Sequence, residues 1–257
     1  MAIDGALGAA LAVPLVAAGG VAAWKFATYS QLEFITAAML TNQVPKNKPT
    51  VIQLQGGTRE LFYYPKSLLQ VTVVGESMNK SLIEQAGLQA AIPTLCKPQS
   101  PTNLGFAADA SVDAVVSLGA LAGMGEAQRT AFAAEALRVL KPGCPIIFLE
   151  KIPGGLPFRF LGSSDKTISP SYLEGWKALS GQFELVTWDV ALEGQDPHAV
   201  GVAVKAENAR PLVVPTSPRE KAAEKAERER SEREARKERE RAAKAKKKGF
   251  EKSGASS

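Results

Sequence analysis

The sequence predicts an α/β fold in which helices cover both faces of a mostly parallel sheet. Three observations predict it. Short apolar segments alternate with segments of helical periodicity, as in βαβ units. A small-residue turn follows the first apolar segment, and an acidic residue follows the second. Excess positive charge is confined to the end of the chain, which leaves a long, nearly neutral segment that can bury one full core.

The first two expected strands and the turn between them are central to this prediction. The apolar run Val51–Leu54 leads into residues 55–58 (QGGT), and a second run, Val71–Val74, is soon followed by Glu76. We expect strand, glycine turn, helix, strand and acid, which is the layout of a nucleotide-binding βαβ unit. Glycines let a ligand approach the backbone closely, and the acid can accept hydrogen bonds from ribose hydroxyls.

The remaining segments continue the alternation of helices and strands. Residues 90–104 are dotted with prolines and show no clear period, and the segment 151–169 is rich in glycine and proline and predicts a long loop. The expected helices are 27–41, 81–87, 126–140 and 171–179, and the further strands are 112–118, 145–150, 183–190 and 199–204.

The N-terminal segment predicts a membrane anchor. Gly5–Trp24 holds 20 residues without a charge, the length that crosses the hydrocarbon of a bilayer. Lys25 and Lys46 follow it, and basic residues favour the cytosolic or stromal side of a membrane. We therefore expect an anchor helix in 1–25 and a helix with a linker in 26–49. A buried or interfacial helix, or part of a targeting segment, is the alternative.

A charged tail ends the chain. Between Arg219 and Lys252 lie 15 basic and 9 acidic residues, a net charge of +6 in a chain of +5, so the other residues carry −1. The basic character therefore gives no argument for a DNA-binding domain, and no DNA partner is expected. After a linker in 207–218, opposite charges four residues apart predict a partly helical tail in 219–257. It either stays solvated or contacts anionic lipid, RNA or an acidic protein.

The few cysteine and histidine residues exclude several kinds of site. Cys96 and Cys144 have no CxxC spacing, so neither a disulfide framework nor a cysteine-based zinc site is expected. His198 is the single histidine of the chain and excludes a multi-histidine metal site. No metal centre is predicted.

Three segments resemble class I S-adenosylmethionine (SAM)-dependent methyltransferases. The type 11, UbiE-like branch, which includes membrane-anchored thiol methyltransferase-like proteins, is the most similar. Val51–Pro65 carries the strand and glycine turn. Residues 104–117 (LGFAADASVDAVVS) and 135–151 (EALRVLKPGCPIIFLEK) are similar to the family's LPFPDASFDAVV and ExxRVLKPGG segments. Residues 196–205 (DPHAVGVAVK) look like the branch's last strand. The resemblance places a methyltransferase-like domain in 50–206.

The resemblance implies a seven-stranded, doubly wound, Rossmann-like sheet whose last strand is antiparallel. SAM would lie across the carboxyl ends of the first strands, at the topological switch point. The residues that would face its methionine part are Gln55, Gly56, Gly57 and Thr58. Glu76 would accept hydrogen bonds from both ribose hydroxyls.

Later strands supply the other candidate residues. The resemblance puts Asp113 in an acidic position at the start of the fourth strand and Ser117 in the floor of the methyl-transfer site. Glu150 and His198 are weaker candidates for substrate contacts. Glu150 ends a strand that faces the expected site, and His198 could act as a base, although a structural role is the alternative.

Four positions depart from the family pattern, so the glycine motif is degenerate. Gln53 replaces an acid, and Gln55 replaces the first glycine. The third glycine position holds Thr58 or Arg59, and residues 97–106 contain no acid for the adenine amine. A side chain at position 55 would point into the cofactor crevice or force the turn to move. These departures indicate altered or lost SAM binding.

Two functional hypotheses follow. The first is a SAM-dependent methyltransferase that acts on a small or lipophilic acceptor at a membrane. The second is a methyltransferase fold that has lost catalysis and serves as a scaffold or accessory subunit of a membrane complex, with the tail as a contact arm. A third, an RNA-associated methyltransferase, depends on the tail alone. We expect membrane association with the domain on the cytosolic or stromal side, and the chloroplast is one candidate compartment.

Overall fold

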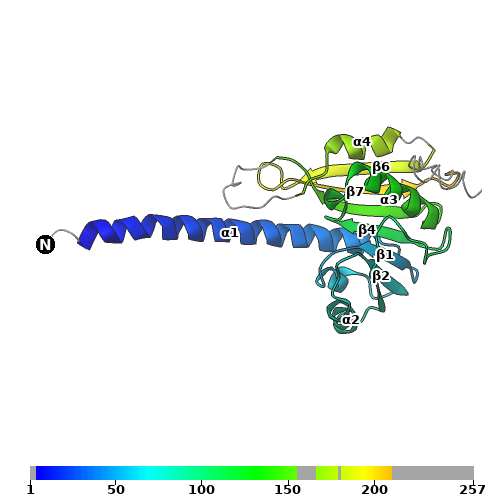
Figure 1. Ribbon diagram of the computed structural model, residues 1–257, viewed down its shortest axis with the longest axis horizontal. Helices are drawn as coiled ribbons and strands as arrows, with labels where there is room; N and C mark the ends of the chain where they lie inside the picture. The colour runs from blue at the N-terminus through cyan, green and yellow to red at the C-terminus, as the bar shows by residue number, and fades with distance from the viewer. Residues whose placement is uncertain (1–3, 155–165, 179–180, 210–257) are drawn as a thin grey trace, which may run out of the picture. The chain divides into compact units, whose positions relative to one another are not determined.

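A computed structural model describes residues 4–154, 166–178 and 181–209, with the backbone alone at 4–19, 21 and 178 (Figure 1). Its sheet has seven strands in the order β3-β2-β1-β4-β5-β7-β6. Strand β7 is antiparallel to β5 and to β6, and the other neighbours are parallel. The strands are β1 (Thr50–Leu54), β2 (Gln70–Val74), β3 (Thr94–Lys97), β4 (Ala114–Leu118), β5 (Pro145–Lys151), β6 (Phe183–Ala191) and β7 (His198–Lys205). The expected seven-stranded sheet with an antiparallel last strand is confirmed.

Helices connect the strands on both faces of the sheet. The alternation of side chains along each strand produces two buried clusters. Ile52 and Phe148 pack with residues of α3 and α4, whereas Val51 and Ile147 pack with residues of α1, η1 and α2. The helices are α1 (Asp4–Gln43), α2 (Lys80–Gln89), α3 (Glu126–Val139) and α4 (Pro170–Ala178), with 3-10 turns η1 (Glu60–Tyr63) and η2 (Leu121–Gly123). The doubly wound arrangement follows from these two clusters.

The connection between β1 and β2 differs from the expected helix. It contains only the four-residue 3-10 turn η1. Tyr64, which follows η1, is extended, with φ −68° and ψ 146°. Proline disfavours the helical conformation in the residue before it, and Pro65 stands at that place. The turn therefore ends after four residues and leads directly into β2.

Helix α2 and strand β3 also differ from the expectation. We predicted that Gly87 would end the helix, but α2 continues to Gln89. A Cβ at Gly87 would lie 2.6 Å from the Cβ of Thr94 in β3. The glycine therefore lets the helix approach the strand closely, and it does not stop the helix. Strand β3 itself lies in the proline-dotted segment in which no strand was predicted.

The two ends of the chain leave their predictions open. Helix α1 joins the predicted anchor and the helix expected in 27–41 into one element. We find no membrane-spanning helix among the described residues, where none is both long and apolar enough. Most side chains of Gly5–Trp24 lie outside those residues, so the anchor stays a prediction. The linker predicted in 207–218 is described only up to residue 209, and the tail predicted in 219–257 lies outside the described residues.

Candidate functional site

The carboxyl ends of β1 and β4 mark the place where the chain reverses its direction across the sheet. From β1 it continues to β2 and β3 on one side, and β4 and β5 lie on the other. Ligands of open α/β sheets bind at such a switch point. The parallel register brings most predicted site residues to this edge, namely the turn 55–58, Glu76, Ser117 and Glu150. His198 reaches the same edge because β7 is antiparallel and pairs it with Lys151.

Gln55 adopts a left-handed backbone conformation that glycine adopts more readily than other residues do. Its φ is +44°, and Gly56 after it has a φ of +112°. The N–H of Gln55 donates to the carbonyl of Val74 at 2.8 Å, so the residue extends the pairing of β1 with β2. Its side chain crosses towards β2, since a Cβ at Gly75 would lie 3.0 Å from Gln55 Cγ and 3.1 Å from Met78 Sδ. Gln55 and Met78 therefore line the space between the ends of β1 and β2.

The buried, hydrogen-bonded side chains of Gln53 and Tyr64 support the glycine turn from the interior of the domain. The Gln53 side chain is fully buried, and its Nε2 donates to the carbonyl of Gln55 at 3.1 Å. The Tyr64 hydroxyl donates to Gln53 Oε1 at 2.9 Å. Burial, and secondarily the charge of Glu60, raises the pKa of Tyr64 well above its usual value, so the hydroxyl remains a donor. The amide at position 53 thus holds the turn in place, a role that an acid could not fill with the same donor.

Glu76 is the most available acid at this edge. It is exposed, and no hydrogen bond or ion pair engages it within the part of the chain that the structure describes. It follows β2 by two residues, beside Gly75 and the Gln55 side chain. A free carboxylate in this position can accept hydrogen bonds from two neighbouring hydroxyls.

Ser117 and Glu150 form a buried contact that fixes the loop after β4. The Ser117 hydroxyl donates to Glu150 Oε1 at 2.5 Å. The same carboxylate accepts the backbone N–H groups of Leu121 at 3.1 Å and Ala122 at 2.9 Å. Burial raises the pKa of the Glu150 carboxyl, and the hydrogen bonds that it accepts oppose the rise. The carboxylate is therefore occupied within the chain, and its substrate contact stays a prediction.

His198 is buried at the start of β7. Its Nδ1 lies 2.7 Å from the carbonyl oxygen of Asp196, and 7% of the residue is exposed. The neighbouring pair Lys151 and Asp196 forms a salt bridge of 2.6 Å. These contacts fit the structural alternative for His198, and a role as base stays a prediction.

Asp113 does not lie at this edge. It precedes β4, at the amino end of the strand, whereas the glycine turn follows the carboxyl end of β1. Asp113 Oδ2 accepts the backbone N–H of Thr50 at 2.9 Å, and Oδ1 pairs with Lys141 Nζ at 2.6 Å. The residue ties the turn after α3 to the start of β1. We therefore do not retain Asp113 as a cofactor contact.

Helix α1 contacts the segment that follows the glycine turn. Arg59 donates to Tyr29 Oη at 2.9 Å and to Glu33 Oε1 at 2.6 Å. The Tyr63 hydroxyl donates to the same Glu33 oxygen at 3.2 Å, and Thr41 Oγ1 donates to the carbonyl of Tyr63 at 3.2 Å. No sequence pattern indicates this cluster, because the hydrogen-bonded residues lie 22 to 30 positions apart in the chain. It positions η1 and, through η1, the end of the turn.

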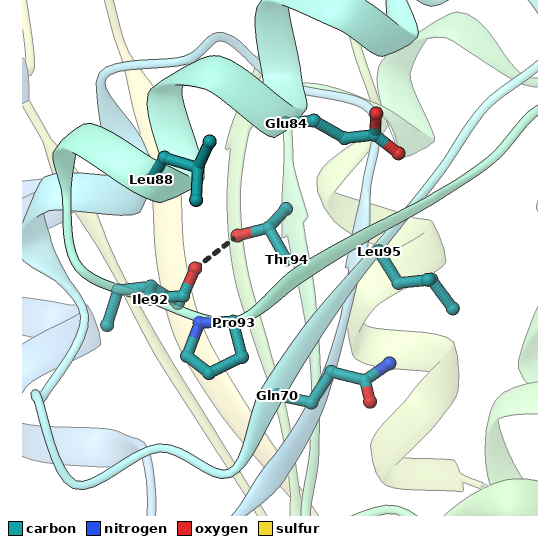
Figure 2. A pocket seen from close by; sticks show the side chains of 7 residues that line it. All are labelled: Gln70, Glu84, Leu88, Ile92, Pro93, Thr94 and Leu95. Carbon is teal, nitrogen blue, oxygen red and sulfur yellow. Dashed lines mark hydrogen bonds between the residues drawn. The ribbon is translucent and has the colours of Figure 1, made fainter.

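A separate hollow of about 400 Å³ lies at the opposite end of the strands from the glycine turn. Figure 2 shows Glu84 and Leu88 on α2 above Thr94, whose hydroxyl donates to the carbonyl of Ile92 at 3.0 Å. Gln70, the first residue of β2, also lines it. These residues mark the amino ends of β2 and β3. The hollow is therefore distinct from the crevice at the carboxyl ends.

A family model of protein sequences matches part of this domain. Residues 55–148 match the family model Methyltransf_11, a methyltransferase domain. The chain has the class I SAM-dependent methyltransferase fold. The match begins at Gln55, so the degenerate turn is itself part of it. No curated protein sequence matches the chain.

Solved structures share the fold at low sequence identity. The SAM-dependent methyltransferase SibL has a TM-score of 0.53 and 16% identity over 70% of this chain, which spans 57% of SibL. The geranyl diphosphate C-methyltransferase of Streptomyces coelicolor A3(2), solved with S-adenosyl-L-homocysteine, has a TM-score of 0.51 and 11% identity over 69% of this chain and 80% of its own. The [4+2]-cyclase SpnF has a TM-score of 0.53 and 16% identity over 66% of this chain and 80% of its own. Since one of these proteins is named a cyclase, the fold alone does not decide the reaction.

Proposed function

We propose that this chain is a SAM-dependent methyltransferase that acts on a small or lipophilic acceptor at a membrane surface. One observation carries the proposal: the glycine turn and the free carboxylate of Glu76 lie together at the carboxyl edge of a methyltransferase fold. SAM is cationic at its sulfonium and ammonium groups and has two ribose hydroxyls. Exposed backbone carbonyls and a carboxylate suit such a ligand.

The residues present can support methyl transfer by positioning alone. SAM supplies a methyl group that an acceptor attacks in line with the bond to sulfur, so orientation and exclusion of water matter more than an acid–base pair. Glu76 would hold the ribose, and the turn 55–58 would hold the methionine part. The Ser117–Glu150 contact fixes the loop after β4 next to the crevice. In this proposal Glu150 is a positioning residue.

Calorimetry with the purified full-length chain tests the proposal. We expect SAM to bind in the micromolar range and Glu76→Ala to weaken binding by roughly 10- to 100-fold, because two hydrogen bonds to a charged group are lost. Glu84→Ala removes a half-buried acid on α2, outside the crevice, and is the control that should leave binding unchanged. Binding that is equally strong in the Glu76→Ala chain would disprove the ribose assignment.

A scaffold or accessory subunit without catalysis is the second candidate function. The conformation of Gln55 favours it, because its side chain crosses the space between β1 and β2. The same calorimetry separates the two functions. A chain that is folded but releases no heat with millimolar SAM is the scaffold and not the enzyme.

The proposed site of action is a membrane surface reached through the N-terminal segment, with the domain on the cytosolic or stromal side. A lipophilic acceptor concentrates in a bilayer, so an anchored enzyme would meet it there. We expect the full-length chain to float with vesicles of neutral lipid and a chain without residues 1–25 to stay in the dense fraction. If the truncated chain floats equally well, residues 1–25 are not the anchor. Flotation only of anionic vesicles would instead indicate contact through the basic tail.

A further inference from the structure

A carboxylate lies directly against the backbone of the glycine turn. A Cβ at Gly57 would meet Glu60 Oε2 at 3.0 Å and Oε1 at 3.3 Å. In the same way, a Cβ at Gly56 would meet Gln53 Nε2 at 2.5 Å. The two glycines therefore lie on two polar side chains, one neutral and one acidic. Of these two side chains, Gln53 is fully buried, and Glu60 is only partly buried.

The two side chains differ in how their polar atoms are satisfied. The Gln53 amide accepts from Tyr64 and donates to the carbonyl of Gln55. Glu60 Oε2, by contrast, is shielded from solvent and has no hydrogen-bond partner among the described residues. Removing a carboxylate oxygen from water costs desolvation free energy. Without a hydrogen-bond donor, nothing compensates that cost.

The neighbouring residue Arg59 does not compensate this charge. Arg59 precedes Glu60, but its guanidinium is held by Tyr29 and by Glu33, with which it forms a 2.6 Å salt bridge. No salt bridge of the described residues includes Glu60. An acid in the first turn of η1 can be stabilised by backbone N–H groups, but no such bond reaches its Oε2. Glu60 Oε2 therefore has no donor among the described residues, although its carboxylate lies against the backbone of the turn.

We propose that Glu60 binds the ammonium group of the methionine part of SAM and supplies there the negative charge that Gln53 lacks. The inference rests on the proposed function. An ammonium group has three donors, and a hydrogen bond between two charged groups is about twice as strong as a neutral one. Gly57 has no side chain that would separate the ligand from the Glu60 carboxylate. The neutral Gln53 in β1 is then compatible with SAM binding, because Glu60 in the first turn of η1 supplies the negative charge instead.

The test compares three ligands that differ in their amino-acid part. SAM and S-adenosyl-L-homocysteine carry the ammonium group, whereas 5′-methylthioadenosine keeps the nucleoside and the sulfur but has no amino-acid part. In calorimetry with the full-length chain, we expect Glu60→Gln to lower the affinity for SAM and S-adenosyl-L-homocysteine by about 10- to 100-fold. The affinity for 5′-methylthioadenosine should change by less than about twofold. Glu84→Gln makes the same chemical change on α2, outside the crevice, and should leave all three unchanged.

A second variant and a stability measurement separate recognition from folding. Glu60→Asp keeps the charge on a shorter side chain, so its losses should fall between those of the wild type and Glu60→Gln. The thermal midpoint of Glu60→Gln should equal or exceed that of the wild type, since a neutral amide is less costly to shield than a carboxylate. A lower midpoint with equal losses for all three ligands would show that Glu60 merely holds the turn.

The outcomes distinguish this inference from the proposed function. If the wild-type chain binds SAM and Glu60→Gln binds all three ligands equally well, the inference is overturned and the proposed function stands. If the folded wild-type chain binds none of the three ligands, the proposed function fails and the inference fails with it. Loss restricted to the two ligands with an ammonium group supports both.

Discussion

Replacing Gln55 with glycine is expected to strengthen SAM binding about tenfold and to raise the free energy of unfolding by about 1 kcal/mol. Two features of the structure predict this result. The φ of +44° is unfavourable for a glutamine and natural for a glycine. The Gln55 side chain also lies beside Gly75, at the end of the strand that leads to Glu76. A ligand that spans β1 and β2 must first displace this side chain. The apparent affinity is then the intrinsic affinity multiplied by the fraction of molecules in which the side chain is displaced.

Two measurements on one matched pair of variants check this expectation. Calorimetry gives the change in SAM affinity, and urea denaturation gives the change in the free energy of unfolding. Ala110→Gly is the control, because Ala110 is exposed, has a similar φ of +49° and precedes β4 at its amino end. We expect it to stabilise the chain to a similar degree and to leave SAM binding unchanged.

Weaker SAM binding in Gln55→Gly would contradict the proposed obstruction. That result would mean that the Gln55 amide contacts the ligand and that the turn has exchanged a glycine for a hydrogen-bonding residue. A chain that binds SAM only after Gln55→Gly would instead identify Gln55 as the residue that blocks binding in the scaffold. The substitution thus reports on both candidate functions.

Strong local patterns predicted much of the fold. The apolar runs that became β1, β2 and β5 were located to within one residue, because buried parallel strands are continuously apolar and end at turn residues. The helix expected in 126–140 was also located correctly, since α3 spans Glu126–Val139. Strand β3 was missed because it has only four residues, and at the edge of the sheet just one of them, Cys96, is buried.

Less of the candidate site than of the fold could be predicted, because its contacts join residues whose proximity only the folded chain reveals. Asp113 fits an acidic motif position, but the register places it at the amino end of β4, beside Lys141. Glu60 was overlooked because an acid after a turn is common in sequences. Only the approach of its carboxylate to Gly57 and the absence of a partner for its Oε2 among the described residues distinguish it. No spacing rule in the sequence conveys either fact.

Replacing Gly201 with alanine is expected to lower the free energy of unfolding by about 3 kcal/mol. Gly201 lies in β7, opposite Phe148 of β5 and Trp188 of β6. An added Cβ would lie 2.5 Å from the carbonyl oxygen of Thr187 and 2.6 Å from Phe148 Cζ, and it would also collide with the Cβ of Trp188. Backbone and a buried ring cannot move as a flexible side chain can, so the strand must shift. Urea denaturation followed by tryptophan fluorescence measures the loss.

The same substitution in α4 provides the control. A Cβ at Gly175 would meet no atom within 4 Å, and alanine favours a helix by roughly 0.5–1 kcal/mol over glycine, so Gly175→Ala should stabilise the chain. A Gly201→Ala chain as stable as the wild type would show that β7 can separate from its neighbours without cost. That result would also weaken the proposed positioning role of Glu150, because Glu150 pairs with Ala199 of β7 and its carboxylate holds Ser117 and the loop after β4. Loss of stability without loss of SAM affinity would instead show that the packing of β7 stabilises the fold and does not contribute to SAM binding.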